Sequence, residues 1–397
     1  STDFNTIPQD PKNPLTTEKV ALGKLLYHET GLAISPMMSQ SAGQYSCASC
    51  HFASAGFQAN RVQGISEGGQ GFGINGEGRE RNPDYDESMM DVQPLRTPSA
   101  MNTAFQTNML WNGQFGATGI NTGTDAYWTP GTPIVNNELG YEGLETQAIA
   151  GLGVHRMDME SLPGVIEDLG YKAMFDNIFS DFPENERYTK ETAGLAIAAF
   201  ERTLLANQAP FQKYLKGEIS AITEQEKKGA ILFFADAGCA SCHNGPGLNN
   251  MEFHALGMKD LYTCPEEIFK VITDDPANRG RGSFTGQSAD DYKFKVPQLY
   301  NMKDSPFFGH GASLRTIKEV VEYKNRAISE NANVPASQIA DDFLPLNLTD
   351  EQVDDLTAFL KFSLYDPYLD RYVPESLPSG NCTPFNDPIA REDLGCN

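Results

Sequence analysis

The chain has no long hydrophobic run and few basic residues. Its longest apolar stretches, such as Ile231–Ala235, fall far short of the roughly 18 unbroken apolar residues of a membrane span. Among 397 residues, 30 are Lys or Arg and 53 are Asp or Glu, which gives a net charge of −23. Such a surface repels phosphate backbones and attracts basic proteins. We therefore expect neither a transmembrane span nor nucleic-acid binding.

Cysteine and histidine are also scarce, yet four of the seven cysteines and two of the six histidines fall in two identical motifs. The motifs are Cys47-Ala-Ser-Cys50-His51 and Cys239-Ala-Ser-Cys242-His243. In Cys-x-x-Cys-His, two thiols add to the haem vinyl groups and the histidine binds iron, so one short turn supplies all three bonds. A zinc site would need further Cys or His pairs at ligand spacing, and a thioredoxin-like pair would need a βαβ context. The sequence therefore predicts two covalently bound haem c groups.

Haem c is attached outside the bacterial cytoplasm, where disulfides are also permitted. Ser1-Thr-Asp-Phe4 has neither the basic nor the apolar region of a signal peptide. We interpret the chain as the mature form of a periplasmic protein whose leader has been removed. Outside the motifs, Cys382 can pair with either Cys396 or Cys264, and the sequence leaves both pairings open.

Helix signals dominate, and long alternating strand patterns are absent. Capping boxes at Thr223/Glu226 and Thr349/Gln352 predict two helix starts. The apolar spacing also favours helices over 193–205 and 316–324. The loops 64–91, 113–143 and 274–291 have lengths that are typical of segments with a function. We expect a mainly α-helical protein of two cytochrome-c-like haem domains with long irregular loops.

Gly23-Lys-Leu-Leu-Tyr27 precedes the first motif, and Gly229-Ala-Ile-Leu-Phe233 precedes the second. This likeness indicates an ancient duplication. We expect residues 1–185 to form an N-terminal haem domain and residues 186–397 a C-terminal one, with the C-terminal tail packing back on the first domain.

The residues around both motifs resemble the bacterial di-haem cytochrome c peroxidase and MauG superfamily. The blocks that carry the resemblance are Leu22–Tyr27 with Ser46–His51, Arg96–Asn102 with Leu110–Gly113, Ala199–Leu204, Gly238–Gly257 and Phe294–Val321. The resemblance implies a peroxidase whose N-terminal haem reduces hydrogen peroxide, with electrons relayed from a small cytochrome c or cupredoxin through the C-terminal haem. One alternative is a MauG-like enzyme that oxidises residues of a partner protein, and another is a non-enzymatic electron carrier. Homodimers are common in the family.

The resemblance also implies roles around the first haem. Trp111 matches a tryptophan that lies between the two haems. Glu67 sits near the position at which peroxidases of the family have a histidine ligand, so the first haem is expected to be open. Gln147 matches a distal glutamine. The acidic group that follows it in the family is assigned to Asp158 through a one-residue insertion, with His155 as the alternative acid/base.

The sixth ligand of the second haem is left open by the sequence. Lys324 stands at the family's ligand position and Tyr323 one residue before it, and neighbours on a helix point about 100° apart. A lysine ligand must be deprotonated, which burial favours. Met258 and Met302 are further candidates, and His310 resembles a family histidine near this haem.

A calcium ion lies between the haems in the family. Its carbonyl ligands match Asp304 and Pro306, but Arg96 replaces the asparagine ligand, and its positive charge disfavours calcium. Oxygen ligands from Glu67 or Asp304 would have to compensate.

Overall fold

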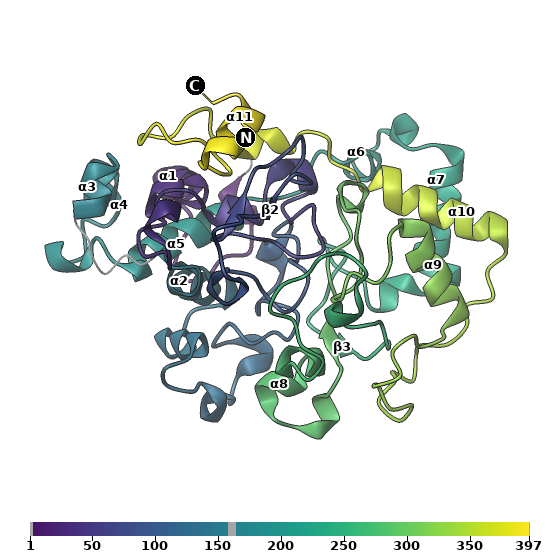
Figure 1. The fold of residues 1–397 in the computed structure, drawn as a ribbon. Helices are drawn as coiled ribbons and strands as arrows, with labels where there is room; N and C mark the ends of the chain where they lie inside the picture. The colour runs from purple at the N-terminus through teal and green to yellow at the C-terminus, as the bar shows by residue number, and fades with distance from the viewer. Residues whose placement is uncertain (1–2, 158–163, 397) are drawn as a thin grey trace.

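The computed structural model of the protein describes residues 3–157 and 164–396 and is mainly helical (Figure 1). The helices are α1 Thr17–His28, α2 Gly143–Val154, α3 Gly164–Asp168, α4 Lys172–Ile178, α5 Lys190–Glu201, α6 Pro210–Leu215, α7 Glu224–Ile231, α8 Gly282–Thr285, α9 Ile317–Arg326, α10 Asp350–Ala358 and α11 Pro388–Leu394. The π-helical turns Leu232–Asp236 and Phe359–Ser363 continue α7 and α10. The short antiparallel pairs are β1 Gly69–Gln70 with β2 Glu80–Arg81, and β3 Phe253–His254 with β4 Phe294–Lys295. The predicted mainly α class is confirmed.

Polar side chains begin the helices as the sequence predicts. The Thr223 hydroxyl accepts from the Glu226 amide while the Glu226 carboxylate accepts from the Thr223 amide, and Thr349 and Gln352 repeat this arrangement at α10. Helix α5 ends at Glu201, before the end of the predicted helix 193–205. The backbone turns away there, and the Leu204 carbonyl accepts from the Asn102 amide instead. Within the described ranges, no helix combines the length and apolar character needed to cross a membrane.

Each haem motif follows a helix that crosses a later helix at a glycine. A Cβ at Gly23 of α1 would overlap the Ala196 carbonyl of α5, and a Cβ at Gly229 of α7 would overlap the Asp355 carbonyl of α10. These equivalent crossings parallel the predicted duplication. Helix α5 packs on α1 and α2, although the predicted boundary after residue 185 places it in the second domain. The two-domain division itself stays a prediction.

The C-terminal tail (yellow in Figure 1) lies on the part of the chain that carries the first haem motif. Asp387 forms a 2.6 Å ion pair with Arg79, and both side chains are buried. The Ser49 hydroxyl, inside the first haem motif, donates to the Pro384 carbonyl over 2.7 Å. A disulfide joins Cys382 to Cys396, whereas Cys264 is free. The structure thus selects one of the two pairings that the sequence left open.

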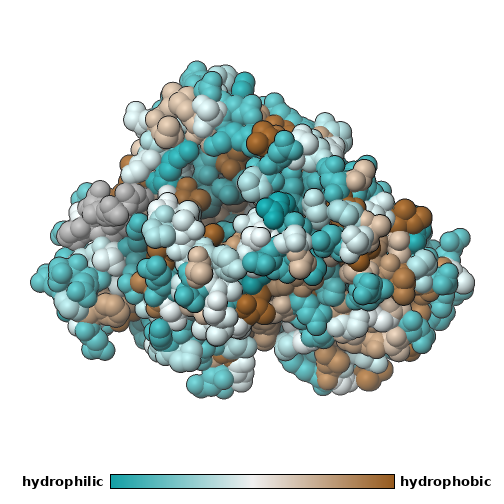
Figure 2. All heavy atoms as spheres, turned by 90° about the horizontal axis from the view of Figure 1, so that it is seen from below, coloured by the Kyte–Doolittle hydropathy of each residue, from teal (hydrophilic) through white to brown (hydrophobic). Residues whose placement is uncertain are grey.

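The face shown in Figure 2 is largely hydrophilic, in keeping with the net charge of −23. Hydrophobic residues form only small separate patches on it, and more of them lie toward the side of α7, α9 and α10.

Candidate haem centres

The two Cys-x-x-Cys-His motifs have the same local geometry. Cys47–Ser49 and Cys239–Ser241 each form a 3₁₀ turn. The backbone amide of the following histidine donates to the carbonyl of the first cysteine, over 3.2 Å at His51 and 2.9 Å at His243. Each turn therefore presents two thiols and an imidazole together.

Backbone carbonyls fix the tautomer of both imidazoles. The His51 Nδ1 donates to the Phe57 carbonyl over 3.2 Å. The His243 Nδ1 lies 3.1 Å from the carbonyls of Leu248 and Pro297. Carbonyls only accept, so Nδ1 holds the proton and Nε2 is left for a metal. Burial lowers the pKa of each histidine to about 4, which keeps both rings neutral. This donor set fits a covalently held haem at each motif.

A histidine–aspartate pair lies on the side of the first centre toward α2. His155 follows the last turn of α2, and its Nδ1 lies 2.8 Å from Oδ2 of the buried Asp91. Burial acts to lower the pKa of His155, but the charge and hydrogen bond of Asp91 outweigh it and leave the pKa above its ordinary value. The charge of His155 in turn acts on His51. The His155 side chain is 31% exposed, and no hydrogen bond to its Nε2 is formed within the described residues.

Glu67 lies in the same region, but its carboxylate is already engaged. One oxygen accepts from the Tyr85 hydroxyl over 2.9 Å and from the Met38 amide over 3.2 Å. The other forms an ion pair with Arg156. The buried Tyr45 hydroxyl has no hydrogen-bond partner among the described residues, and the charges of Glu67 and Asp91 add to burial in raising the pKa of Tyr45.

Sequence reasoning found Glu67 and His155 but missed three residues of this group. Asp91, Arg156 and Tyr45 have no motif of their own. Arg156 lies directly after His155, and this adjacency is the only local sign that the sequence offers for it.

Gln147 and His155 lie on the same side of α2. A Cβ at Gly151 would be 3.6 Å from Nε2 of Gln147 and 4.0 Å from Cδ2 of His155, so both side chains border this glycine. The other predicted acid/base, Asp158, falls outside the described residues.

Trp111 and His310 are in contact, and they come from the two halves of the chain that carry the first and the second haem motif. Their ring centroids are 6.5 Å apart, and His310 stacks on Phe294 with centroids 3.7 Å apart. The backbone contacts are reciprocal: the Arg96 amide donates to the His310 carbonyl over 2.9 Å, and the Lys295 amide donates to the Trp111 carbonyl over 2.8 Å. Trp111 thus belongs to a junction that is built by residues from both halves of the chain.

The two cations at this junction, Arg96 and Lys295, are buried. Burial lowers the pKa of Arg96 to about 10 and that of Lys295 to about 7. Neither forms an ion pair with a carboxylate in the described part of the chain. Arg96 donates to Gln58 and, over 2.9 Å, to the Ser305 hydroxyl. Ser305 stands in the chain between Asp304 and Pro306, the two predicted calcium ligands.

The four candidate sixth ligands of the second haem have different surroundings. Burial lowers the pKa of Lys324 to about 8, and its amine interacts electrostatically with Cys239 and Cys242. The Tyr323 hydroxyl donates to the Leu256 carbonyl over 2.6 Å. Met258 lies against Gly309, with its sulfur 3.0 Å from where a Cβ of that glycine would be. Met302 begins a short turn whose Asp304 side chain lies next to Gly56 of the first haem segment.

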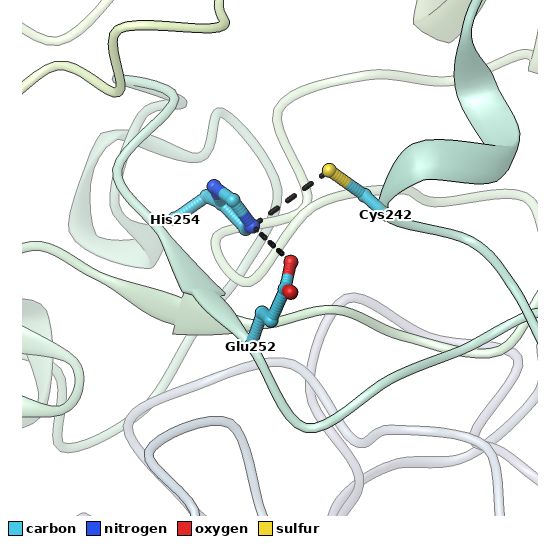
Figure 3. A group of neighbouring side chains, drawn as sticks. All are labelled: Cys242, Glu252 and His254. Carbon is cyan, nitrogen blue, oxygen red and sulfur yellow. Dashed lines mark hydrogen bonds and ion pairs between the residues drawn. The ribbon is translucent and has the colours of Figure 1, made fainter.

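A further histidine borders the second motif. Nε2 of His254 lies 3.2 Å from Oε2 of Glu252 and 3.7 Å from Sγ of Cys242 (Figure 3). In a haem c centre that sulfur is an uncharged thioether, so these three side chains do not form a separate metal site. Glu252 and His254 instead line an open cavity of about 450 Å³ with Phe253 and Arg281.

Two haem-attachment turns with oriented imidazoles, joined by an aromatic pair, define a c-type di-haem protein. The model of the di-haem cytochrome c peroxidase family matches residues 17–220, and the chain belongs to this family. The protein is therefore an oxidoreductase with two haem groups. The predicted family is confirmed.

The chain is similar to proteins from both branches that the sequence indicated. It is 28% identical over 372 residues to the methylamine utilization protein MauG of Methylorubrum extorquens, which covers 91% of this chain and 82% of that protein. It is 27% identical over 375 residues to cytochrome c551 peroxidase of Nitrosomonas europaea, covering 94% and 88%. A solved MauG-like protein associated with microbial copper homeostasis shares the fold, with a TM-score of 0.66, 23% identity, and coverage of 93% and 95%.

Proposed function

We propose that the protein reduces hydrogen peroxide at the haem held by His51, with electrons arriving through the haem held by His243. The unequal surroundings of the two histidines carry this proposal. The acid/base pair His155–Asp91 lies near His51, whereas the amine of Lys324 lies near His243. When bound, the first haem supplies the iron at which the oxygen–oxygen bond is cleaved.

His155 supplies the proton transfers that peroxide cleavage needs. Its Nδ1–H donates to Asp91, so the Nε2 lone pair is available for protons. It would accept a proton from the peroxide oxygen nearer the haem and return it to the oxygen farther from the haem. Gln147, on the same side of α2, orients the peroxide. We assign the acid/base role to His155, and Asp158 remains a prediction from the sequence.

One observation favours the MauG-like alternative, in which the oxidising equivalents leave through a protein substrate. Glu67 replaces the expected histidine ligand, and its ion pair with Arg156 keeps the carboxylate engaged. Adding peroxide to the fully oxidised holoprotein separates the two functions. We expect turnover only after the second haem has been reduced. A lasting oxidised spectrum without prior reduction would establish the MauG-like activity, and no reaction in either state would leave an electron carrier.

Trp111 is the proposed relay between the haems. Trp111→Phe removes the most easily oxidised ring of the junction but keeps an aromatic side chain against His310. We expect slower electron transfer between the haems and a lower kcat with an artificial electron donor, with an unchanged rate of the first reaction with peroxide. Stopped-flow spectroscopy measures both rates. Equal inter-haem rates in the variant and the wild type would remove Trp111 from the path.

The partner and the compartment are proposed on the same basis. A net charge of −23 favours a small basic electron-donor protein, either a cytochrome c or a cupredoxin. Haem c attachment and the disulfide Cys382–Cys396 fit the periplasm. The family resemblance favours a homodimer.

The residues at the predicted calcium site do not fit the ion. Arg96 stands where the family has an asparagine ligand and donates to Ser305, the residue between Asp304 and Pro306. Burial raises the pKa of Asp304 to about 6, which disfavours an anionic ligand there. We therefore expect a metal chelator to leave peroxidase activity and thermal stability unchanged. Calcium-dependent recovery of either property after chelation would show that the ion binds despite Arg96.

A further inference from the structure

The side chain that faces the second haem motif from α9 is Lys324. The charge of its amine acts on Cys239, Cys242 and His243, the three residues that bind the haem. The amine has no hydrogen-bond or ion-pair partner in the ranges that the structure describes. Its Nζ lies over the Phe343 ring, 5.6 Å from the ring centroid, and the carboxylate of the adjacent Asp342 lies 3.7 Å from Sγ of Cys242. A half-buried amine without a partner, directed at a haem-binding turn, points to a metal ligand.

We propose that Lys324, through its neutral amine, would supply the second protein ligand to the iron of the haem that His243 would hold. This inference rests on haem attachment at the second motif and not on the reduction of peroxide. It selects one of four ligands that the sequence left open.

The hydroxyl of the neighbouring Tyr323 already has a hydrogen-bond partner. It is buried, 3% exposed, and its hydroxyl donates to the Leu256 carbonyl over 2.6 Å. Consecutive residues on a helix point about 100° apart, so a rotation of α9 that turned Tyr323 to the haem would break this bond and turn Lys324 away. Met258 packs against Gly309, and Met302 lies in the turn beside the first haem segment. Of the four candidates, Lys324 is the one whose side chain interacts electrostatically with all three residues of the second motif.

Binding of the Lys324 amine to iron needs only the loss of one proton. The ammonium releases one proton to solvent, and the freed nitrogen lone pair forms the bond to iron without a change of oxidation state. With Lys324 bound, the haem at the second motif would have two nitrogen ligands from the protein, in contrast to the first centre. Its potential is expected to lie below that of a methionine-ligated haem, because the thioether ligand raises the potential.

The test uses the ferric holoprotein in the absence of peroxide. We expect the wild type to give a low-spin EPR signal from the second haem, and Lys324→Ala to lose it and gain a high-spin signal. Added methylamine should restore the low-spin signal in Lys324→Ala, since the small amine replaces the missing side chain. Lys324→Met should remain low-spin with a higher midpoint potential and a sulfur-to-iron charge-transfer band.

Tyr323→Phe is the matched control, because it removes the hydroxyl one residue away and keeps the packing of α9. Its EPR signal and potential should equal those of the wild type. Haem content and circular dichroism verify that each variant is folded and loaded. The proposal is overturned if Lys324→Ala keeps the wild-type low-spin signal, or if Tyr323→Phe loses it. A peroxidase failure with these spectra intact would count against the proposed function alone.

Discussion

Replacing His155 by Ala is expected to lower kcat/KM for hydrogen peroxide by about 10²–10⁴-fold, the range that a positioned acid/base group contributes. The variant lacks the Nε2 that takes the proton from the near oxygen, while His51 and both cysteines of the first motif are untouched. Stopped-flow mixing of the holoprotein with peroxide measures the rate. His155→Gln is the second variant, because its amide keeps the hydrogen bond to Asp91 but cannot accept and return a proton.

The pH profile distinguishes a proton-transfer role from a structural one. Only neutral His155 accepts a proton, and Asp91 raises its pKa above the ordinary value. The rate should therefore fall as the pH drops through this raised pKa. In Asp91→Asn, no carboxylate charge opposes the effect of burial, so the pKa of His155 should fall. The pH below which the rate is lost should therefore be lower in this variant. If His155→Ala retained the wild-type rate and Asp158→Asn lost it, the acid/base would be Asp158.

Much of the fold could be predicted because its signals are local. The Cys-x-x-Cys-His turns need only five consecutive residues, and each predicted capping box spans four. Gly23 and Gly229 were aligned as a repeat from the sequence, and the structure gives them the same task at two helix crossings. The boundary after residue 185 was harder to place, since α5 packs on α1 and α2, which lie far before it in the chain.

The site was less predictable because its contacts join distant segments. Asp91 reaches His155 across 64 positions, and Glu67 reaches Arg156 across 89. Asp91 looks like an ordinary surface residue in the sequence, and nothing there pairs Glu67 with Arg156. The choice between Lys324 and Tyr323 depends on the rotation of α9 about its axis, which the Leu256 carbonyl helps to fix. Helical periodicity identifies a face but does not say which partner lies opposite.

The buried ion pair that holds the C-terminal tail should dominate stability near the first haem. Arg79 and Asp387 are 3% and 4% exposed, and the other oxygen of Asp387 accepts from the Gly71 and Ala390 amides. Arg79→Met leaves a buried carboxylate without its cation. We expect the free energy of unfolding to fall by about 3–5 kcal/mol, the usual cost of breaking a buried pair. Denaturant unfolding of the holoprotein measures this loss.

The double variant Arg79→Met/Asp387→Leu tests the reason for that loss. It replaces both charges by apolar groups, so a large part of the stability should return, although two backbone amides lose their acceptor. Lys318→Met, in the exposed pair with Asp354, is the control and should change little. If Arg79→Met proved as mild as this control, the tail would be held by its disulfide and backbone contacts. Because Ser49 donates to Pro384, loss of the ion pair should also speed proteolysis of the tail and loosen the turn that carries Cys47 and Cys50.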